Sequence, residues 1–255
     1  MYRGFILGSV KREFQTRYSN SVLGVIWTVL NPLATILIYT LIFSQIMKAR
    51  LPGVDNNLAY SIYLCSGIVT WGLFAEILSK SQTVFIANAN MIKKLSFPRI
   101  CLPIIVVLNA LVNFAIIFAI FLCFLLVTGN FPGWELATFF PVLLVQVLLA
   151  IGLGISVGVL NVFFRDVGQF FTIVLQFWFW FTPIVYPLSI LSESIARFVR
   201  LNPMTNIVEA YHGIFVTGET PQWSGLLPIA IVAILLCVLG MRLFRKHSGE
   251  MVDLL

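Results

Sequence analysis

The stretch from residue 79 to residue 100, SKSQTVFIANANMIKKLSFPRI, is a long polar interruption in an otherwise apolar chain. It has no acidic residue and four basic ones, Lys80, Lys93, Lys94 and Arg99. A helix is predicted here because apolar residues recur at helical spacing, namely Phe85, Ala89, Ile92 and Leu95. Pro98 predicts that this helix ends near Phe97. The stretch is either a basic loop that fixes topology or a helix that a cytosolic protein contacts.

Composition decides the environment of the chain. Of its 255 residues, 60% are hydrophobic and only 10% are charged, and its mean hydropathy is +0.99. Soluble domains carry about 25% charged residues, so the composition predicts an integral membrane protein. The net charge of +6 does not predict nucleic-acid binding, because the basic residues lie in loops between apolar segments.

Neither a disulfide framework nor a metal site is expected, because the four cysteines are widely separated and no CxxC spacing occurs. No cleavable signal peptide is expected either. Charged residues interrupt any short apolar region near the N-terminus, at Lys11, Arg12, Glu13 and Arg17.

The predicted fold class is an all-α membrane protein with six transmembrane helices. Residues 1–20 are predicted to form an amphipathic interface helix, because apolar residues recur every four positions, at Tyr2, Ile6, Val10, Phe14 and Tyr18. Three charged residues fall close to this apolar arc, Arg3, Glu13 and Arg17. Segments of the roughly 20 residues that cross a bilayer follow at about 22–46, 58–78, 103–127, 136–162, 169–185 and 225–244. Two short helices are expected before the last span, at about 188–200 and 204–217, with Asn202-Pro203 between them.

The distribution of Lys and Arg predicts the topology. With the N-terminus inside, the cytoplasmic segments hold Arg3, Lys11, Arg12, Arg17, Lys80, Lys93, Lys94, Arg99, Arg165, Arg242, Arg245 and Lys246. The opposite side holds Lys48, Arg50, Arg197 and Arg200. This positive-inside bias predicts that both termini and residues 79–100 are cytoplasmic and that residues 186–224 face outward. No internal repeat relates the two halves, which disfavours an inverted-repeat secondary transporter.

Ionisable groups are nearly absent from the predicted spans. In their interiors only Glu76 occurs, in the second span and close to its cytoplasmic end, and it is interpreted as an interfacial residue rather than a proton site. Ion-coupled transporters keep such groups at membrane depth despite a cost of about 2.5–3.5 kcal/mol each, so an ion gradient is not the expected energy source. No phosphate loop, HExxH or GxSxG motif occurs. The chain is therefore not expected to be an enzyme, and energy is expected from another subunit.

Uncharged polar and small residues in the spans predict helix packing. Asn109 and Asn113 lie one turn apart, and other amides are scattered, at Gln146, Asn161 and Gln176. Helix contacts are favoured for these amides over pore lining. A small-xxx-small stripe at Ala150, Gly154 and Gly158, with Gly152 nearby, predicts close packing within one chain or between two. Glu209 and His212, at i and i+3, are interpreted as a surface pair.

Aromatic residues crowd the fifth span, at Phe170, Phe171, Phe177, Trp178, Phe179, Trp180 and Phe181. Such rings could stack on sugar faces in a pore, although lipid-facing packing is an equal alternative for any one ring. The same alternatives apply to Trp71 and Phe74. The channel-lining candidates are Trp71, Phe74, Phe177, Trp178 and Phe181.

Three blocks of sequence resemble the ABC-2-type permeases that export polysaccharides and polyol phosphates such as O-antigen and teichoic acid. The first is YSNSVLGVIW at 18–27 followed by NPL at 31–33, and the second is NANMIKKLSFPR at 88–99 followed by Leu102-Pro103. The third runs from NVFFRDV at 161–167 through TPIVYP at 182–187 to LNPM at 201–204. The blocks occur in the family's order and spacing and cover most of the chain.

The resemblance implies a homodimer of six-span subunits in the bacterial inner membrane, which recruits two copies of a separate ATPase that binds ATP and Mg²⁺. No cofactor is expected in this chain itself. The implied substrate is a polyprenyl-pyrophosphate-linked glycan, with O-antigen preferred, and membrane lipids surround the complex. Teichoic acid, capsule, drug and lipid export are alternatives, and a membrane lipid-sugar transferase is a distant one. Residues 186–224 resemble the family's pair of re-entrant helices at the external mouth of the channel.

The resemblance also implies roles for single residues. The second block resembles the helix that docks in a cleft of the ATPase, and its coupling residues would be Asn88, Ala89, Asn90, Met91, Ile92, Lys93, Lys94, Leu95 and Phe97. The apolar face of Ala89, Ile92 and Leu95 would fit the cleft, and the turn at Arg165 and Asp166 would be a second cytoplasmic contact. Basic residues near the cytoplasmic face are candidates to attract the lipid pyrophosphate, namely Arg12, Arg17 and Arg99.

Overall fold

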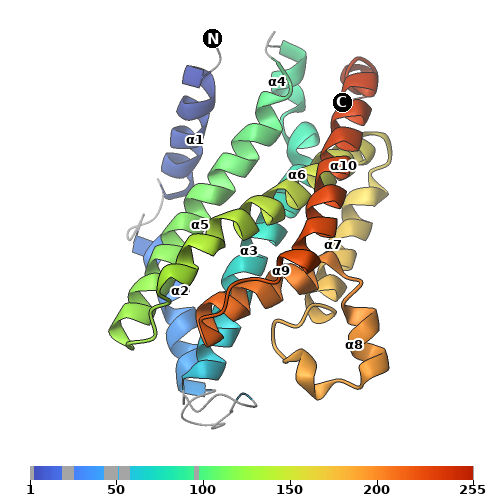
Figure 1. Cartoon of the computed structure of the whole chain (residues 1–255). Coiled ribbons are helices and arrows are strands. Elements are labelled where there is room, and N and C mark those ends of the chain that lie inside the picture. The colour runs from blue at the N-terminus through green and yellow to red at the C-terminus, as the bar shows by residue number, and fades with distance from the viewer. Residues whose placement is uncertain (1–2, 19–25, 43–50, 52–57, 95–97, 255) are drawn as a thin grey trace.

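A computed structural model describes residues 3–18, 26–42, 51, 58–94 and 98–254, and these residues form helices and no strands. The elements, which Figure 1 labels in part, are α1 Arg3–Tyr18, α2 Ile26–Tyr39, α3 Ala59–Ala87, α4 Ala89–Lys94, α5 Cys101–Val127, η2 Trp134–Thr138, α6 Phe139–Phe163, α7 Asp166–Trp180, η3 Leu188–Ile190, α8 Glu193–Val199, α9 Pro203–His212, η4 Gly213–Thr217, α10 Trp223–His247 and α11 Glu250–Leu254.

The described helices include four that are long and apolar enough to cross a membrane: Ala59–Ala87, Cys101–Val127, Trp134–Phe163 and Trp223–His247. A shorter apolar helix covers Val29–Ile42, and α7 has 15 residues. The all-α membrane class is therefore confirmed. The count of six spans stays a prediction, since α2 and α7 fall short of the usual length.

Helix α3 extends nine residues beyond the predicted second span, 58–78, and ends at Ala87. This extension includes the polar pair Ser79 and Lys80. The helix continues there because one of its faces stays buried through Ser81, Gln82, Val84 and Phe85. The polar side chains beyond residue 78 thus belong to a helix that is packed within the protein.

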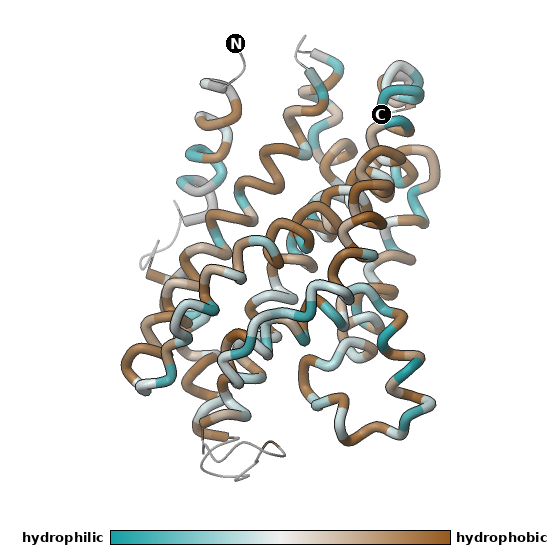
Figure 2. The backbone as a smooth tube through the Cα atoms, viewed as in Figure 1, coloured by the Kyte–Doolittle hydropathy of each residue, from teal (hydrophilic) through white to brown (hydrophobic). Residues whose placement is uncertain are grey.

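The two ends of the bundle differ in content. Both chain termini and α4 lie at one end, here named the α4 end, and α8 lies at the opposite end, here named the α8 end (Figure 1). Hydrophobic residues dominate the long helices between these ends, as Figure 2 shows. The placement of both termini at one end agrees with an even number of crossings.

Helix α6 is the centre of the packing, and its glycines allow the close contacts. A Cβ added at Gly158 would lie 2.5 Å from the carbonyl oxygen of Ser81, and one at Gly154 would lie 2.8 Å from the Ser81 side chain. A Cβ at Gly152 would lie 2.6 Å from the backbone nitrogen of Cys237. The small-residue stripe therefore packs within one chain, with α3 on one side and α10 on the other.

Amide side chains join the buried helices, as the sequence predicts. Gln146 of α6 donates to the carbonyl oxygen of Thr70 on α3 at 2.6 Å and accepts from the hydroxyl of Tyr211 on α9 at 2.7 Å. Because all three residues are buried, these hydrogen bonds fix α3, α6 and α9 against one another. The interpretation of Gln146 as a helix contact is confirmed, whereas Gln176 is exposed.

The segment between α7 and α10 forms two short helical units, close to the predicted 188–200 and 204–217. Asn202 caps α9 by accepting from the backbone nitrogen of Met204 at 3.0 Å, and Pro203 occupies the first turn. This is the favoured chemistry of a helix start. The same Asn202 oxygen accepts from the indole nitrogen of Trp178 at 2.7 Å, and its amide nitrogen donates to the Thr182 hydroxyl at 3.0 Å.

Two tyrosines of α3 fasten the loop that follows α7. The hydroxyl of Tyr60 donates to the carbonyl of Val185 at 2.6 Å, and that of Tyr63 contacts the carbonyls of Pro183 and Tyr186 at 2.8 and 2.9 Å. We name Tyr60, Tyr63, Trp178, Thr182 and Asn202 the outer hydrogen-bond cluster. It connects the second and third parts of the 161–204 sequence block, TPIVYP and LNPM, in space.

The interpretation of Glu209 and His212 as a surface pair is wrong. The His212 ring is buried, and it stacks on the Tyr63 ring with centroids 3.6 Å apart. Neither of its ring nitrogens has a hydrogen-bond partner among the described residues, and burial lowers its pKa to about 3. Spacing along α9 places His212 one turn from Glu209, but α9 turns this face toward α3, which the spacing alone does not show.

Candidate functional site

The predicted coupling segment is a short helix of its own. Helix α3 ends at Ala87, and Asn88 separates it from α4. The Asn88 side chain donates to the carbonyl of Val84 at 2.8 Å, and its own carbonyl accepts from the backbone nitrogen of Ile92 at 3.0 Å. Asn88 therefore ends one helix and begins the next, where the apolar pattern predicts a single helix. Leu95 and Phe97, and with them the predicted helix end, lie outside the described residues.

The expectation that Ile92 fits a cleft of another protein is wrong for this structure. Ile92 is only 6% exposed and belongs to a buried apolar cluster at the α4 end, which we name the inner apolar cluster. Its buried members are Val84, Phe85, Ile92, Leu102, Val106, Ile155, Val159, Val162, Phe244 and Met251. The exposed residues of the segment are instead Ala87, Asn90 and Lys93, while Ala89 and Met91 are half-buried. For Lys94 the structure describes the helix but not the side chain.

The turn between α6 and α7 presents both predicted residues to solvent, since Arg165 and Asp166 are exposed. Asn161 holds this turn in place. Its side chain donates to the Gln82 carbonyl of α3 at 2.7 Å and accepts from the Gly168 backbone nitrogen at 2.8 Å. A Cβ at Gly168 would lie 2.7 Å from the Asn161 side chain. The turn is therefore fixed to α3, the helix that leads to α4.

Among the described residues, no contact brings the candidate lipid-pyrophosphate residues together. Arg12 on α1 is exposed. The Arg99 guanidinium donates to the Ser248 carbonyl just beyond α10, so it joins the start of α5 to the chain's C-terminal segment. The Arg17 side chain lies outside the described part of the structure. A role of these residues in binding pyrophosphate stays a prediction.

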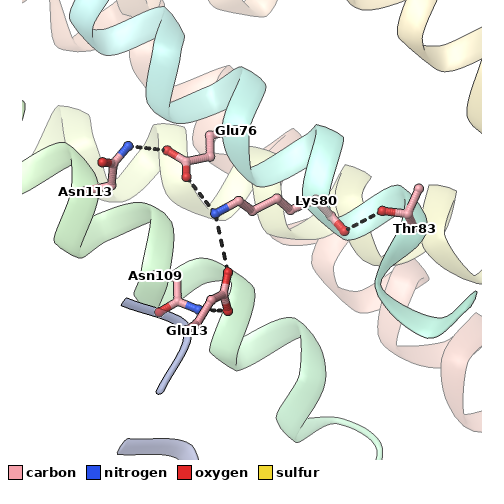
Figure 3. Close-up of polar contacts among 6 residues, drawn as sticks. All are labelled: Glu13, Glu76, Lys80, Thr83, Asn109 and Asn113. Carbon is pink, nitrogen blue, oxygen red and sulfur yellow. Dashed lines mark hydrogen bonds and ion pairs between the residues drawn. The ribbon is translucent and has the colours of Figure 1, made fainter. Parts of the chain in front are cut away.

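An inner polar network joins α1, α3 and α5 (Figure 3). The Lys80 ammonium lies 2.8 Å from a Glu76 oxygen and 3.7 Å from a Glu13 oxygen. Asn113 donates to the other Glu76 oxygen at 2.8 Å, and Asn109 donates to Glu13. One cation is thus shared by two carboxylates from different helices, and each carboxylate also accepts from an amide of α5.

Two features of the sequence indicate parts of this network, but their spacing does not show that the residues contact one another. Glu76 and Lys80 are at i and i+4 on one helix, which favours an ion pair, and Glu13 interrupts the apolar arc of the N-terminal helix. That interruption has a cause, since Glu13 faces α5 and α3. Asn109 and Asn113 are confirmed as helix contacts. Glu76 also lines a cavity of about 280 Å³ between α2, α3 and α5, but its oxygens are occupied by Lys80 and Asn113.

The aromatic candidates divide into buried and exposed residues. Phe74 is fully buried and Trp71 nearly so, and both pack edge-on against Trp178. Phe74 cannot contact a substrate, because helices of its own chain enclose it, and its prediction as a channel residue is wrong. Phe177 and Phe181 are 61% and 55% exposed and line an apolar groove of about 660 Å³ between α7 and the α8–α9 segment.

Comparison with known proteins shows the family to which this chain belongs. Residues 6–216 match the family described as ABC-2 type transporter. The chain belongs to this family. It is 29% identical to the O-antigen export system permease protein RfbA of Myxococcus xanthus over 254 residues, which are 99% of this chain and 95% of that protein. It is also 29% identical to the protein of the same name from Klebsiella pneumoniae over 245 residues, with 96% and 92% covered.

A more distant relative is the polysialic acid transport protein KpsM of Escherichia coli, 23% identical over 248 residues that cover 94% of this chain and 92% of that protein. The family resemblance predicted from the three sequence blocks is confirmed. Permeases of the ABC-2 family are membrane subunits that work with a separate ATPase. The chain is accordingly a multi-pass membrane protein, and the exposed residues of α4 and of the α6–α7 turn are candidates for the ATPase contact.

Proposed function

We propose that this chain is the membrane subunit of an ATP-driven exporter that moves a lipid-linked polysaccharide, of the O-antigen class, across the bacterial inner membrane. The observation that carries the proposal is the near full-length similarity to proteins named as O-antigen export permeases. The chain would act as a homodimer with two ATPase subunits. Its glycan would be linked to polyprenyl pyrophosphate and would pass through a channel at the dimer interface.

The proposed orientation places both termini and α4 in the cytoplasm. Two observations support it. Basic residues are concentrated in the segments that would face inward, which is the usual bias of membrane proteins. The two termini and α4 also share one end of the bundle (Figure 1). The α8 end would then face outward.

The proposed coupling runs through α4 and the inner apolar cluster. Asn90 and Lys93 would contact the ATPase, since both are exposed among the described side chains of α4. Ile92 is buried in the inner apolar cluster, whose other members lie on α3, α5, α6, α10 and α11. Because packed side chains transmit displacement, a force on α4 would move these helices together. The Asn161 contacts would add the α6–α7 turn to the same unit.

A charge reversal tests this coupling surface. Lys93→Glu should lower substrate-linked ATPase activity and surface glycan, because Lys93 is exposed on α4. Lys246→Glu is the matched control, since Lys246 is also exposed and lies at the α4 end, on α10. If Lys93→Glu leaves copurification with the ATPase, ATPase control and export unchanged, α4 is not the coupling helix.

Deletion of the chain in its host tests the function itself. Surface glycan should disappear, and full-length glycan should accumulate on its lipid carrier in the inner leaflet. A lipid-sugar transferase would instead leave the lipid-linked precursor incomplete or unattached. Export of teichoic acid, capsule, drug or lipid would alter those products and spare O-antigen. Unchanged surface polysaccharide in the deletion strain would refute the proposal.

A further inference from the structure

Two polar cavities meet near the α8 end. One has a volume of about 420 Å³ and lies between α9, residues 219–222 and the start of α10. The other, of about 440 Å³, lies between the first turns of α3, residues 187–189 and the α9–η4 segment. Three residues line both cavities, Arg200, Glu209 and Gly213. A guanidinium and a carboxylate are therefore common to the two linings.

Arg200 and Glu209 are near enough to influence each other but are not paired. The described residues contain no ion pair within 4.0 Å that involves either of them. Burial raises the pKa of the Glu209 carboxyl, and the positive charge of Arg200 opposes that rise. The guanidinium can only donate hydrogen bonds, and the ionised carboxylate can only accept them. Both groups thus keep hydrogen-bonding capacity that a ligand in the cavities can use.

The remaining lining suits a sugar ring. Tyr63 and His212 contribute stacked aromatic rings to the second cavity, and Ser189 and Thr217 line it as well. Each volume lies within the roughly 300–1,000 Å³ of small-ligand sites, which combine apolar walls with a few placed polar groups. The neighbouring hydroxyl groups of a sugar can donate to a carboxylate and accept from a guanidinium.

The charge of the lining selects against anionic ligands. Among the described residues, the linings of the two cavities contain one cation, Arg200, and two carboxylates, Glu209 and Glu219. His212 adds no positive charge near neutral pH, since its pKa is lowered to about 3 by burial. A phosphate or carboxylate on the ligand would therefore meet a net negative lining, and such like-charge contacts disfavour the wrong partner.

We propose that the two cavities form one exit-side binding site for a neutral, hydroxyl-rich segment of the exported glycan. Glu209 accepts from sugar hydroxyl groups and Arg200 donates to them. This inference rests on the proposed function and narrows its substrate class. The segment that occupies the site is an uncharged sugar, rather than the repeating phosphate of a polyol phosphate or the carboxylate of an acidic capsule.

Binding to the purified complex tests the site. The probe is the host's surface polysaccharide, released from its lipid by mild acid and added to the permease–ATPase complex in nanodiscs. Glu209→Gln and Arg200→Gln should each weaken binding about tenfold or more, because a hydrogen bond to a charged group is lost. Glu193→Gln is the matched control, an exposed acid on α8 outside both cavities. Poly(glycerol phosphate) should bind less tightly than the neutral probe.

Two results would overturn the proposal: binding by Glu209→Gln and Arg200→Gln within twofold of the wild type, or tighter binding of poly(glycerol phosphate) than of the neutral glycan. Yield and monodispersity of each variant complex are compared with those of Glu193→Gln. If Glu209→Gln fails to assemble, the binding measurement on Arg200→Gln decides the test, since Arg200 is exposed. Failure of this site is distinct from failure of the function, since the deletion strain would then still lose surface glycan.

Discussion

The two ends of this permease are held together by different chemistry. At the α8 end, the outer hydrogen-bond cluster consists of neutral groups. Within it, the single side chain of Asn202 forms hydrogen bonds with Trp178, Thr182 and Met204. At the α4 end, α1 is tied to α3 through the shared ammonium of Lys80, whose side chain is 33% exposed. Neutral buried hydrogen bonds are short-ranged and geometrically specific, whereas partly exposed ion pairs are weak and screened by salt.

This difference indicates which end can rearrange. The α8 end is a fixed frame, because several segments share the same few hydrogen-bonding side chains. The α4 end can exchange partners, since two carboxylates already compete for one cation. In the proposed coupling, contacts at the α4 end would change when the ATPase acts, and contacts at the α8 end would persist. Four substitutions test the comparison, from the largest expected loss of stability to the smallest.

Gly158→Ala should cause the largest loss of stability, since it disrupts the close contact between α3 and α6, on which both ends depend. The added Cβ would lie 2.5 Å from the backbone oxygen of Ser81, which cannot move without shifting α3. We expect a loss of about 3 kcal/mol in the free energy of unfolding, measured by thermal unfolding of the purified protein. Gly72→Ala is the control, because nothing lies within 4 Å of its added Cβ. Equal stability of the two variants would contradict the close contact.

Asn202→Ala should remove the centre of the outer hydrogen-bond cluster. The α9 cap would be lost and the Trp178 indole nitrogen would lose its acceptor, at a combined cost of about 2–3 kcal/mol. Asn206→Ala, which loses only a 3.4 Å contact to the Arg200 carbonyl, should stay within about 0.5 kcal/mol of the wild type. Chemical unfolding in detergent compares the two. A fixed frame at the α8 end is ruled out if Asn202→Ala is equally neutral.

Acidification should weaken the α8 end through His212. Its folded pKa of about 3 lies below the unfolded value of about 6.5, so its stabilising effect is complete above pH 6.5 and is lost as pH falls toward 3. At pH 5 the loss is about 2 kcal/mol. His212→Leu should lose less stability than the wild type between pH 7.5 and pH 5. Identical slopes for the two proteins would exclude a buried neutral His212.

Lys80→Met should have the smallest effect on stability, about 1 kcal/mol or less, because the Lys80 side chain is partly exposed and its ion pairs are screened. Its effect on function should be larger, since Glu13 and Glu76 would repel each other across α1 and α3. We expect uncoupled ATPase activity in the complex, with partial recovery when Glu76→Gln is added. Lys11→Met, an exposed change on α1, is the control. Normal coupling in Lys80→Met would show that the inner polar network is passive.

Much of the fold follows from local signals. Apolar segments locate the long helices, Asn202-Pro203 locates the start of α9, and the glycine stripe of α6 predicts close packing. These features depend on residues near one another in the chain, where backbone and membrane requirements act directly. Local signals do not predict which helix each packing surface contacts. The stripe alone does not indicate whether Gly158 faces α3 or a second chain.

The site was predicted less completely, because its geometry depends on contacts between distant segments. Helical spacing places Ile92 on an apolar face, but only the fold shows that this side chain is already buried in the inner apolar cluster of its own chain. Likewise, the aromatic ring of Phe74 is suited to stacking on a glycan, but the fold places Phe74 in the buried core. Glu13 is 67 residues from its cationic partner, Lys80, and no periodicity connects them.

Helix α3 is one continuous element of 29 residues, which corresponds to roughly 43 Å at 1.5 Å per residue. Its first turns hold the loop after α7 through Tyr60 and Tyr63, and its last residue adjoins Asn88 and α4. A rigid rod of this length that pivots at one end by about 5° displaces its other end by roughly 4 Å. Since the α8 end is the held end, this displacement falls at the α4 end, where α3 can follow a movement of α4 without breaking the Tyr60 and Tyr63 contacts.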